Sequence, residues 1–457
     1  LLVCGVHGTR MMLFAWALHA VRRNFNLPLA FIAPPLMVSA ELCVPSLFQY
    51  YVAMALARQP LLIQVADLTG VLGVSALLML VNGAVYDVLT APPRRIVVAA
   101  AAAAVLVAAL AYGHLRIAQV RDLRAAAPKI RVGVVQPNVV SFDEPDGTFS
   151  VAAQRRLAAL QARSAELEAM GADLILWPES SYKVWISRRS AGDWPESHPS
   201  RIGRGFSAPL VINALTYDPP KSSARPYNSA LLLDRGNFTA RYDKNNLMMF
   251  GESIPGAETL PWLKGLVPNA SQYMAGEGVT MLPFRDRAGR EWRLGPMICL
   301  EDILPGFGRQ LGRQRPHLLI NLTNDAWFGD TSEPWQHLAL SIFRSVELRT
   351  EMVRAVNTGV SAYVDATGRI YSESYVVDPT QETRGADKFL AEVALLEGGH
   401  TAYVAAGESF GYAGTVLTLY LWLIAPRLRR SRASASSQDS AVTSPPDLWA
   451  SPPAGKG

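Results

Sequence analysis

The chain has 457 residues, of which 50% are hydrophobic and 18% are charged. This length exceeds that of one ordinary domain, and the apolar balance indicates a chain that is partly dissolved in lipid. The net charge of +5 is not gathered into a basic stripe with interleaved aromatic residues, which argues against a nucleic acid partner. Cys4, Cys43 and Cys299 show no CxxC spacing, so neither a zinc site nor a disulfide framework is supported.

Apolar stretches dominate the first quarter of the chain and return near its end. They occupy residues 1–21, 27–57, 68–86, 96–113 and 409–426, and the stretch 27–57 is interrupted by prolines and Glu41. The clearest is 96–113, because its eighteen uncharged residues are enough to cross a bilayer as a helix. Buried helices of a soluble core are the alternative, but so many such segments favour a bundle of transmembrane helices.

Arginines at the ends of these stretches predict the orientation of the bundle, since Lys and Arg stay on the cytoplasmic side. Arg94 and Arg95 precede one stretch, and four arginines follow the last one: Arg427, Arg429, Arg430 and Arg432. Residues 115–405 are then expected on the opposite side. The chain begins Leu-Leu, and we expect further leading helices to be missing.

The middle of the chain alternates short strand-like runs with amphipathic helices. We expect strands at 130–136, 173–177, 209–214, 229–234, 293–299, 318–323 and 360–365, and helices at 151–170 and 335–356. This pattern predicts an α/β or α+β enzyme domain. The expected organisation is a transmembrane region at 1–126, a catalytic domain at 127–404, a last transmembrane helix at 405–426 and a disordered tail at 427–457.

Three residues of reactive types stand at or near the ends of apolar runs in the middle domain. Glu179 follows LILWP, Lys244 follows ARYD, and Cys299 follows RLGPMI. Loops at such positions expose side chains above a rigid sheet. The intervals between them, 65 and 55 residues, allow each to come from a separate strand unit.

Each of these residues has an ordinary alternative when it is taken alone. A loop glutamate is usually solvated, a lone lysine usually lies on the surface, and a free cysteine is usually a small buried hydrophobe. Together they offer a thiol nucleophile, a carboxylate that takes its proton and a cation that stabilises an oxyanion. The set therefore predicts a Cys299 nucleophile with Glu179 as base and Lys244 as charge partner.

The ordered motifs WPES, YDKNNLMMFGESIP, MICLED and NLTNDAWFGD resemble those of apolipoprotein N-acyltransferases, a membrane branch of the nitrilase superfamily. Likeness extends to Gln336-His337 and to 354–360. This resemblance implies an α/β fold of the nitrilase kind, a four-layer α-β-β-α sandwich inserted between transmembrane helices. It also implies the base, lysine and nucleophile roles for Glu179, Lys244 and Cys299.

The resemblance further implies supporting residues. Glu252 and Glu301 match carboxylates that support the triad, and Leu300 offers its backbone N–H to the oxyanion. Asn324 and Trp327, with the neighbouring Phe328, are candidates for the pocket lining, with a structural role as the alternative. The chain departs from the family at Met248-Met249, where Val-Pro is usual, and at Leu300, where Tyr is usual.

The expected activity is transfer of a fatty acyl group from phospholipid, through a Cys299 thioester, to the α-amine of a lipidated apolipoprotein. The implied partners are the phospholipid donor, the diacylglyceryl-modified acceptor and the bilayer, with no cofactor or metal. The implied location is the bacterial inner membrane, multi-pass, with the catalytic domain on the periplasmic face. The apolar segment 260–274 is expected either to dip into the membrane interface or to fold into the core.

Two other functions stay open from the sequence. A membrane-anchored carbon-nitrogen hydrolase would use the same triad with water as the acceptor. A catalytically silent membrane scaffold is the other, and the intact set of Glu179, Lys244 and Cys299 argues against it.

Overall fold

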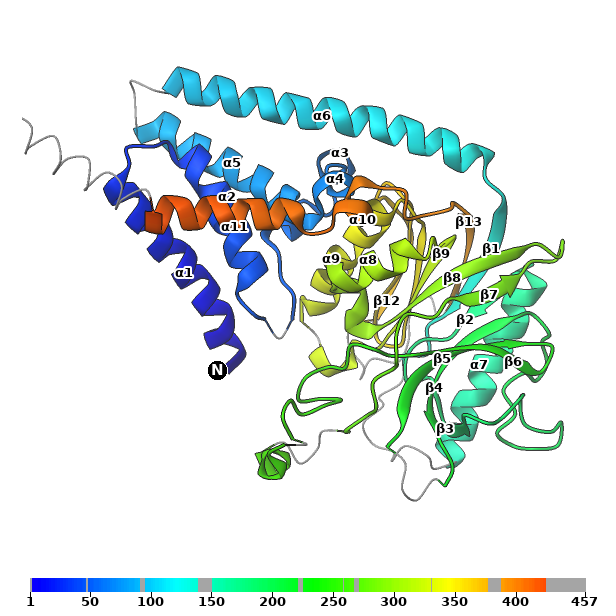
Figure 1. The fold of residues 1–457 in the computed structure, drawn as a ribbon. Helices are drawn as coiled ribbons and strands as arrows, with labels where there is room; N and C mark the ends of the chain where they lie inside the picture. Colours follow the sequence, from blue (N-terminus) through cyan, green and yellow to red (C-terminus); the bar gives the residue numbers. More distant parts are fainter. Residues whose placement is uncertain are drawn as a thin grey trace, which may run out of the picture.

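The computed structural model describes residues 2–46, 48–90, 95–138, 150–220, 225–257, 259–266, 271–329, 331–376 and 388–424. It consists of a helical part and a sandwich of two β-sheets flanked by helices (Figure 1). The predicted tail at 427–457 lies outside the described residues. So do Arg94 and the arginines after the last apolar stretch, which were used to predict the orientation.

The helical part is built from both ends of the described chain. Its elements are α1 (Leu2–Asn24), α2 (Leu29–Cys43), η1 (Val52–Leu56), α3 (Pro60–Ile63), α4 (Ala66–Thr69), α5 (Val71–Thr90), α6 (Arg95–Ala126), α11 (Ser409–Leu419) and η7 (Tyr420–Ile424). Helix α2 packs closely on α5, because Gly83 has no side chain where a Cβ would lie 2.6 Å from the backbone nitrogen of Ala30. Helix α11 packs on α2 beside them (Figure 1).

Two of the described helices, α5 and α6, are long and apolar enough to cross a membrane. In their most apolar windows 56% of the α5 residues are buried, but only 22% of the α6 residues. Helix α6 therefore leaves apolar side chains such as Ile96, Val107 and Leu115 exposed. The expected stretch 68–86 is divided, because Gly70 adopts φ +69° and separates α4 from α5.

Among the described residues the strands form two sheets. The seven-stranded sheet has the order β13-β1-β2-β4-β5-β6 with β3 beside β4, and the six-stranded sheet has the order β12-β11-β10-β9-β8-β7. The strands are β1 (Lys129–Val135), β2 (Leu174–Leu176), β3 (Tyr182–Ser187), β4 (Leu210–Tyr217), β5 (Tyr227–Asp234), β6 (Asn237–Asp243), β7 (Leu282–Arg285), β8 (Glu291–Ile298), β9 (Leu318–Thr323), β10 (Met352–Val356), β11 (Gly359–Val364), β12 (Ile370–Val376) and β13 (Lys388–Ala394).

Helices cover the outer faces of both sheets, which gives the expected four layers. On the seven-stranded sheet, α7 (Val151–Ala169) buries Leu157 and Leu160 against Ile175 and Ile212. On the other sheet, α8 (Pro305–Arg313) and α9 (Glu333–Leu348) lie side by side (Figure 1). Burial of each large aliphatic side chain contributes about 1.5–3 kcal/mol, so these faces hold the layers together.

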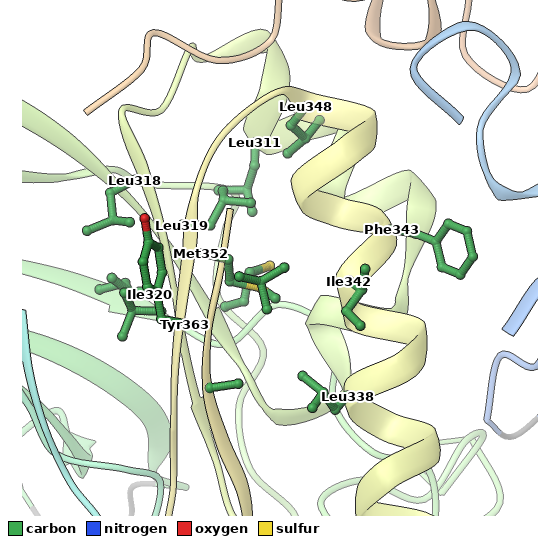
Figure 2. Close-up of a cluster of buried hydrophobic side chains, with 14 of the residues drawn as sticks. Leu311, Leu318, Leu319, Ile320, Leu338, Ile342, Phe343, Leu348, Met352 and Tyr363 are labelled. Carbon is green, nitrogen blue, oxygen red and sulfur yellow. The ribbon is translucent and has the colours of Figure 1, made fainter. Parts of the chain in front are cut away.

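Helix α9 lies between the sandwich and the helical part. Figure 2 shows Leu338 and Ile342 facing the strands, while Phe343 points to the other side of the helix. One hydrophobic cluster contains these residues together with Ile63 and Val71 of the helical part. The two parts therefore share a continuous core.

The expected strands are confirmed, each overlapping an observed one, and the helix expected at 151–170 is confirmed as α7. The helix expected at 335–356 is wrong in its second half. Helix α9 ends at Leu348, since Arg349 is left-handed, and Met352–Val356 pairs in parallel with β9. The residues of β10 are all buried, and such a short buried run has no periodicity that distinguishes a strand from a helix.

Candidate active site

Cys299 stands on a sharp turn at the end of β8. It is the first residue of the 3-10 turn η5 (Cys299–Ile303), and its φ of +53° is a conformation that costs a non-glycine residue free energy. The turn is held from behind: Asn321 Nδ2 donates to the Cys299 carbonyl at 3.2 Å, and the Ile298 N–H donates to Glu301 Oε2 at 2.9 Å. This geometry lifts the half-buried thiol out of the sheet.

Glu179 and Lys244 meet beside this turn. Glu179 follows β2 after Pro178, and Lys244 directly follows β6. Both side chains are buried, with the Lys244 Nζ atom 3.5 Å from Glu179 Oε1. The 65 residues that separate them in the sequence therefore do not separate them in space.

Glu252 and Asn228 complete the cluster. Glu252 holds the ammonium group of Lys244 through Oε2 at 2.8 Å and Oε1 at 3.0 Å. Asn228 Nδ2 donates to Glu179 Oε1 and to Glu252 Oε1, each at 2.9 Å. Among the described residues these two contacts of Glu179 both use Oε1, which makes Oε2 the candidate proton acceptor. Asn228 was not predicted, since one asparagine at the start of a strand carries no signal of its own.

The electrostatics of the cluster keep the Cys299 thiol protonated at rest and raise the proton affinity of Glu179. Burial, and then the charge of Glu179, raise the pKa of the Cys299 thiol well above its ordinary value, although Lys244 opposes them. Burial also raises the pKa of Glu179. Burial alone would lower the pKa of Lys244, but Glu252 and Glu179 outweigh it and hold this pKa well above its usual value. Lys244 is therefore a fixed cation, and Glu179 is the group with a proton affinity to suit a base.

Glu301 lies behind Cys299. Its Oε1 accepts hydrogen bonds from the Tyr242 hydroxyl at 2.7 Å and from the backbone N–H groups of Asn245 and Asn246 at 2.9 and 3.0 Å. It thus joins the Cys299 turn to the segment that carries Lys244. Burial raises the pKa of Glu301, while these donors oppose the shift.

A cavity of about 450 Å³ opens over these groups. Eight of the predicted residues line it: Glu179, Lys244, Glu252, Cys299, Leu300, Asn324, Trp327 and Phe328. Glu301 is fully buried below the turn and is not among the lining residues. Phe48, Gln49 and Tyr50 of the helical part form another part of the wall, which the sequence did not indicate.

The first residues of the apolar segment 260–274 lie on the surface. Leu260 and Trp262 are exposed, whereas Leu263 packs on Ile254 and Ala257. Tyr273 lines the cavity, and Val267 lies outside the described residues. The segment is therefore partly folded in and partly presented to the surroundings.

Comparison with known proteins identifies the family to which this domain belongs. The carbon-nitrogen hydrolase family matches residues 131–385, which contain Glu179, Lys244 and Cys299. This chain belongs to the carbon-nitrogen hydrolase family. Residues 1–84 match the N-terminal domain of apolipoprotein N-acyltransferases. Its sandwich is thus a nitrilase-like α/β fold.

The curated relatives that match this chain are apolipoprotein N-acyltransferases, the family whose motifs the sequence resembles. An apolipoprotein N-acyltransferase of Geobacter metallireducens is 31% identical over 68% of this chain and 58% of its own length. One of Chlorobaculum tepidum is 31% identical over 68% of this chain and 62% of its own length. The resemblance is thereby confirmed, and the chain spans less than two thirds of these relatives.

Among solved structures, a nitrilase-superfamily protein from Saccharomyces cerevisiae matches at 18% identity with a TM-score of 0.40. The match covers 58% of this chain and 90% of that one.

A second buried charge cluster includes Asp302 of the Cys299 turn in this carbon-nitrogen hydrolase domain. His337 of α9 hydrogen bonds through Nε2 to Asp302 and through Nδ1 to Asp325, each at 2.9 Å. Arg354 of β10 pairs with the same two carboxylates, at 3.1 Å for Asp325. His337 and Arg354 appeared in the motif comparison without an assigned role.

Asp325, Glu333 and His337 bring possible metal-ligand atoms within 4.8 Å of one another. The arrangement does not fit a metal centre, because both ring nitrogens of His337 are engaged and Arg354 occupies Asp325. Burial and Arg354 would lower the pKa of His337, but Asp302 and Asp325 raise it to about 10. The cluster is therefore an ion-pair network with a protonated histidine.

Proposed function

We propose that this protein is an acyltransferase that moves a fatty acyl group from a membrane phospholipid to the α-amine of a diacylglyceryl-modified N-terminal cysteine of an apolipoprotein. One observation carries the proposal: the buried Glu179 and Lys244 pair and Cys299 line a single cavity whose wall is completed by the helical part. A cavity lined both by a reactive thiol and by a bundle of apolar helices suits substrates that stay in the bilayer. Exposing acyl chains to water would cost about 0.8 kcal/mol per CH₂.

The first half-reaction forms a thioester. Glu179 takes the proton of Cys299, and the thiolate attacks the ester carbonyl carbon of the phospholipid. The carbon–sulfur bond forms, and the ester carbon–oxygen bond breaks. The proton on Glu179 passes to the departing lysophospholipid oxygen.

The second half-reaction forms the amide. The acceptor amine attacks the thioester carbon, and Glu179 takes a proton from the amine. The carbon–nitrogen bond forms as the carbon–sulfur bond breaks, and the Cys299 sulfur recovers a proton. The same carboxylate therefore acts as base and then as acid in both halves.

Lys244 and the backbone N–H groups at the start of η5 stabilise the oxyanion. Lys244 is held by Glu252 and Glu179, so its ammonium group is positioned before the substrate arrives. Leu300 lies in the first turn of η5, where backbone N–H groups lack partners within the turn. Such donors stabilise a developing negative charge without reorganisation, by about 3–4 kcal/mol per donor.

The proposed setting is the bacterial inner membrane. Helices α5 and α6 span it in this proposal, together with shorter apolar helices, and residues 127–404 stand on the periplasmic face between membrane segments at 1–126 and 405–426. Exposed apolar side chains in the segment after Lys244, among them Phe250, Leu260 and Trp262, are suited to contact the lipid interface. Arg95 supports the orientation within the described residues.

A carbon-nitrogen hydrolase with water as acceptor is the alternative, and one experiment separates the two. Purified protein in phospholipid vesicles receives phospholipid with a labelled acyl chain and a diacylglyceryl-cysteine lipopeptide with a free α-amine. We expect labelled N-acyl peptide. The matched peptide with an acetylated amine should stay unlabelled. Labelled free fatty acid that forms at the same rate with either peptide, without N-acyl product, would establish hydrolysis instead.

A further inference from the structure

A loop of the helical part forms one wall of the catalytic cavity. We call residues 44–51 the bundle loop; it joins α2 to η1, and the structure describes all of it except residue 47. Phe48, Gln49 and Tyr50 of this loop line the same cavity as Cys299. The catalytic residues come from the sandwich, so the cavity is complete only where the two parts meet.

Buried polar side chains hold the backbone of the bundle loop and its continuation. Arg10 of α1 is 1% exposed and donates from Nη1 to the Tyr50 carbonyl and from Nη2 to the Val44 carbonyl at 3.2 Å. Glu41 of α2 accepts the Val52 N–H at 2.7 Å. A buried guanidinium group is costly to desolvate unless its hydrogen bonds are made. The geometry of the loop is therefore specified from two helices.

The bundle loop also touches the sandwich beside the nucleophile. The Phe48 ring packs edge-on against Phe328 with 5.8 Å between the ring centres. Phe328 ends η6 (Ala326–Phe328), which also carries Trp327 of the cavity wall. Aromatic rings present a large apolar surface with little side-chain entropy to lose. The wall made by Phe48, Phe328 and Trp327 is thus suited to methylene groups rather than to a charged headgroup.

We infer that Phe48, Gln49 and Tyr50 of the bundle loop form the subsite for the acyl chain of the donor, with Phe48 as a specificity-determining residue and Arg10 as the residue that positions it. This inference rests on the proposed function. In this inference Phe48 contacts methylenes that a hexadecanoyl chain has and an octanoyl chain lacks, so it discriminates between donors by chain length. Arg10 acts only through the loop, by fixing the carbonyls on both sides of Phe48.

The test compares donors that differ only in chain length. Thioester formation is measured in a single turnover with hexadecanoyl and octanoyl phospholipids of one headgroup, for the wild type, Phe48→Ala and Arg10→Gln. We expect both variants to lower the ratio of the long-chain to the short-chain rate by about three- to tenfold, because each buried methylene contact is worth about a factor of four. Alkylation of Cys299 by iodoacetamide checks that the nucleophile turn is intact.

Matched controls lie on α1 and α2 and do not line the cavity. Phe31→Ala removes an exposed ring of α2, and Arg22→Gln removes an exposed guanidinium of α1. Both should keep the wild-type ratio. Phe48→Ala removes no buried polar partner, so it decides the question even if Arg10→Gln fails to fold.

The outcomes separate this inference from the function on which it rests. A wild type that forms the thioester, together with a Phe48→Ala variant whose chain-length ratio stays within about twofold of it, would overturn the subsite. A wild type that forms no thioester with either donor would contradict the proposed function itself, and the subsite with it.

Discussion

Two buried charge clusters lie close to the Cys299 turn, and they differ in how their charges balance. The cluster of Glu179, Glu252 and Lys244 sets two carboxylates against one ammonium group. The cluster of Asp302, Asp325, His337 and Arg354 sets two carboxylates against a guanidinium and a protonated imidazole. The first cluster carries an unbalanced negative charge, whereas these four groups of the second cluster balance. Glu333 and His337 also line the cavity, and burial raises the pKa of Glu333, which lies 4.0 Å from His337, to about 7.

This difference in charge balance indicates that the first cluster takes part in the reaction and that the second stabilises the fold. An unbalanced carboxylate in a buried site has a raised proton affinity, which a base for Cys299 needs. The balanced network of Asp302, Asp325, His337 and Arg354 joins η5, α9 and β10 through hydrogen bonds. We therefore expect changes in the first cluster to affect rate, and changes in the second to affect stability.

The largest effect should come from the nucleophile. Cys299→Ala removes the atom that carries the acyl group, and we expect N-acylation to fall by more than about a thousandfold. Cys43→Ala is the control, because Cys43 is an exposed thiol of α2. Product formation from labelled phospholipid measures both. Substantial activity in Cys299→Ala would remove the thiol from the mechanism.

The next largest effect should come from the base. Glu179→Gln keeps the shape and removes the proton acceptor, and we expect a loss of about a hundred- to ten-thousandfold in the single-turnover rate of thioester formation. The exposed Glu196→Gln serves as the control. Unchanged unfolding by denaturant in Glu179→Gln would show that the loss is chemical. A rate within about threefold of wild type would assign the base elsewhere.

The neutral cluster should respond in stability. His337→Gln leaves Asp302 and Asp325 with one cation, and we expect the free energy of unfolding to fall by about 3–5 kcal/mol at neutral pH. His400→Gln, at an exposed histidine, should cost little. Denaturant unfolding in detergent measures both changes.

The pH dependence sharpens this prediction. The folded pKa of His337, about 10, lies above the unfolded value of 6.5, so its contribution to stability is complete below pH 6.5 and is lost as pH rises through about 10. The difference in stability between wild type and His337→Gln should shrink across that window. A difference that stays constant from pH 6 to 10 would mean that the histidine is not protonated in the folded protein.

The smallest effect should come from Asn228, which only orients the catalytic carboxylates. Asn228→Ala removes its hydrogen bonds to Glu179 and Glu252, and we expect a loss of about tenfold in rate. The hydrogen bond from Asn228 lowers the pKa of Glu179, so its removal should move the acidic limb of the pH–rate profile to higher pH. Asn237→Ala, at an exposed position, should leave the limb in place.

Residues at strand ends could be predicted from the sequence. Glu179, Lys244 and Cys299 each follow a run whose pattern indicates a strand, and the sheets bring such ends together. The limit of this reasoning is visible at β10, which was predicted as helix. Its burial comes from both faces of a sheet, so the sequence shows no alternation there.

Contacts between distant segments could not be predicted. Phe48 and Phe328 lie far apart in the sequence, and no sequence pattern around either residue indicates that the two rings are in contact. Asn228 and Arg10 are likewise ordinary polar residues until the fold supplies their partners. Their roles depend on tertiary packing, which a local pattern does not encode.

The most direct test of the proposed mechanism is the location of the acyl group in the enzyme. Protein incubated with acyl-labelled phospholipid and no acceptor is digested, and the labelled peptide is identified. We predict a label on Cys299 that hydroxylamine releases and that the acceptor lipopeptide discharges as N-acyl peptide. Transfer to the lipopeptide without any label on Cys299 would contradict the thioester mechanism.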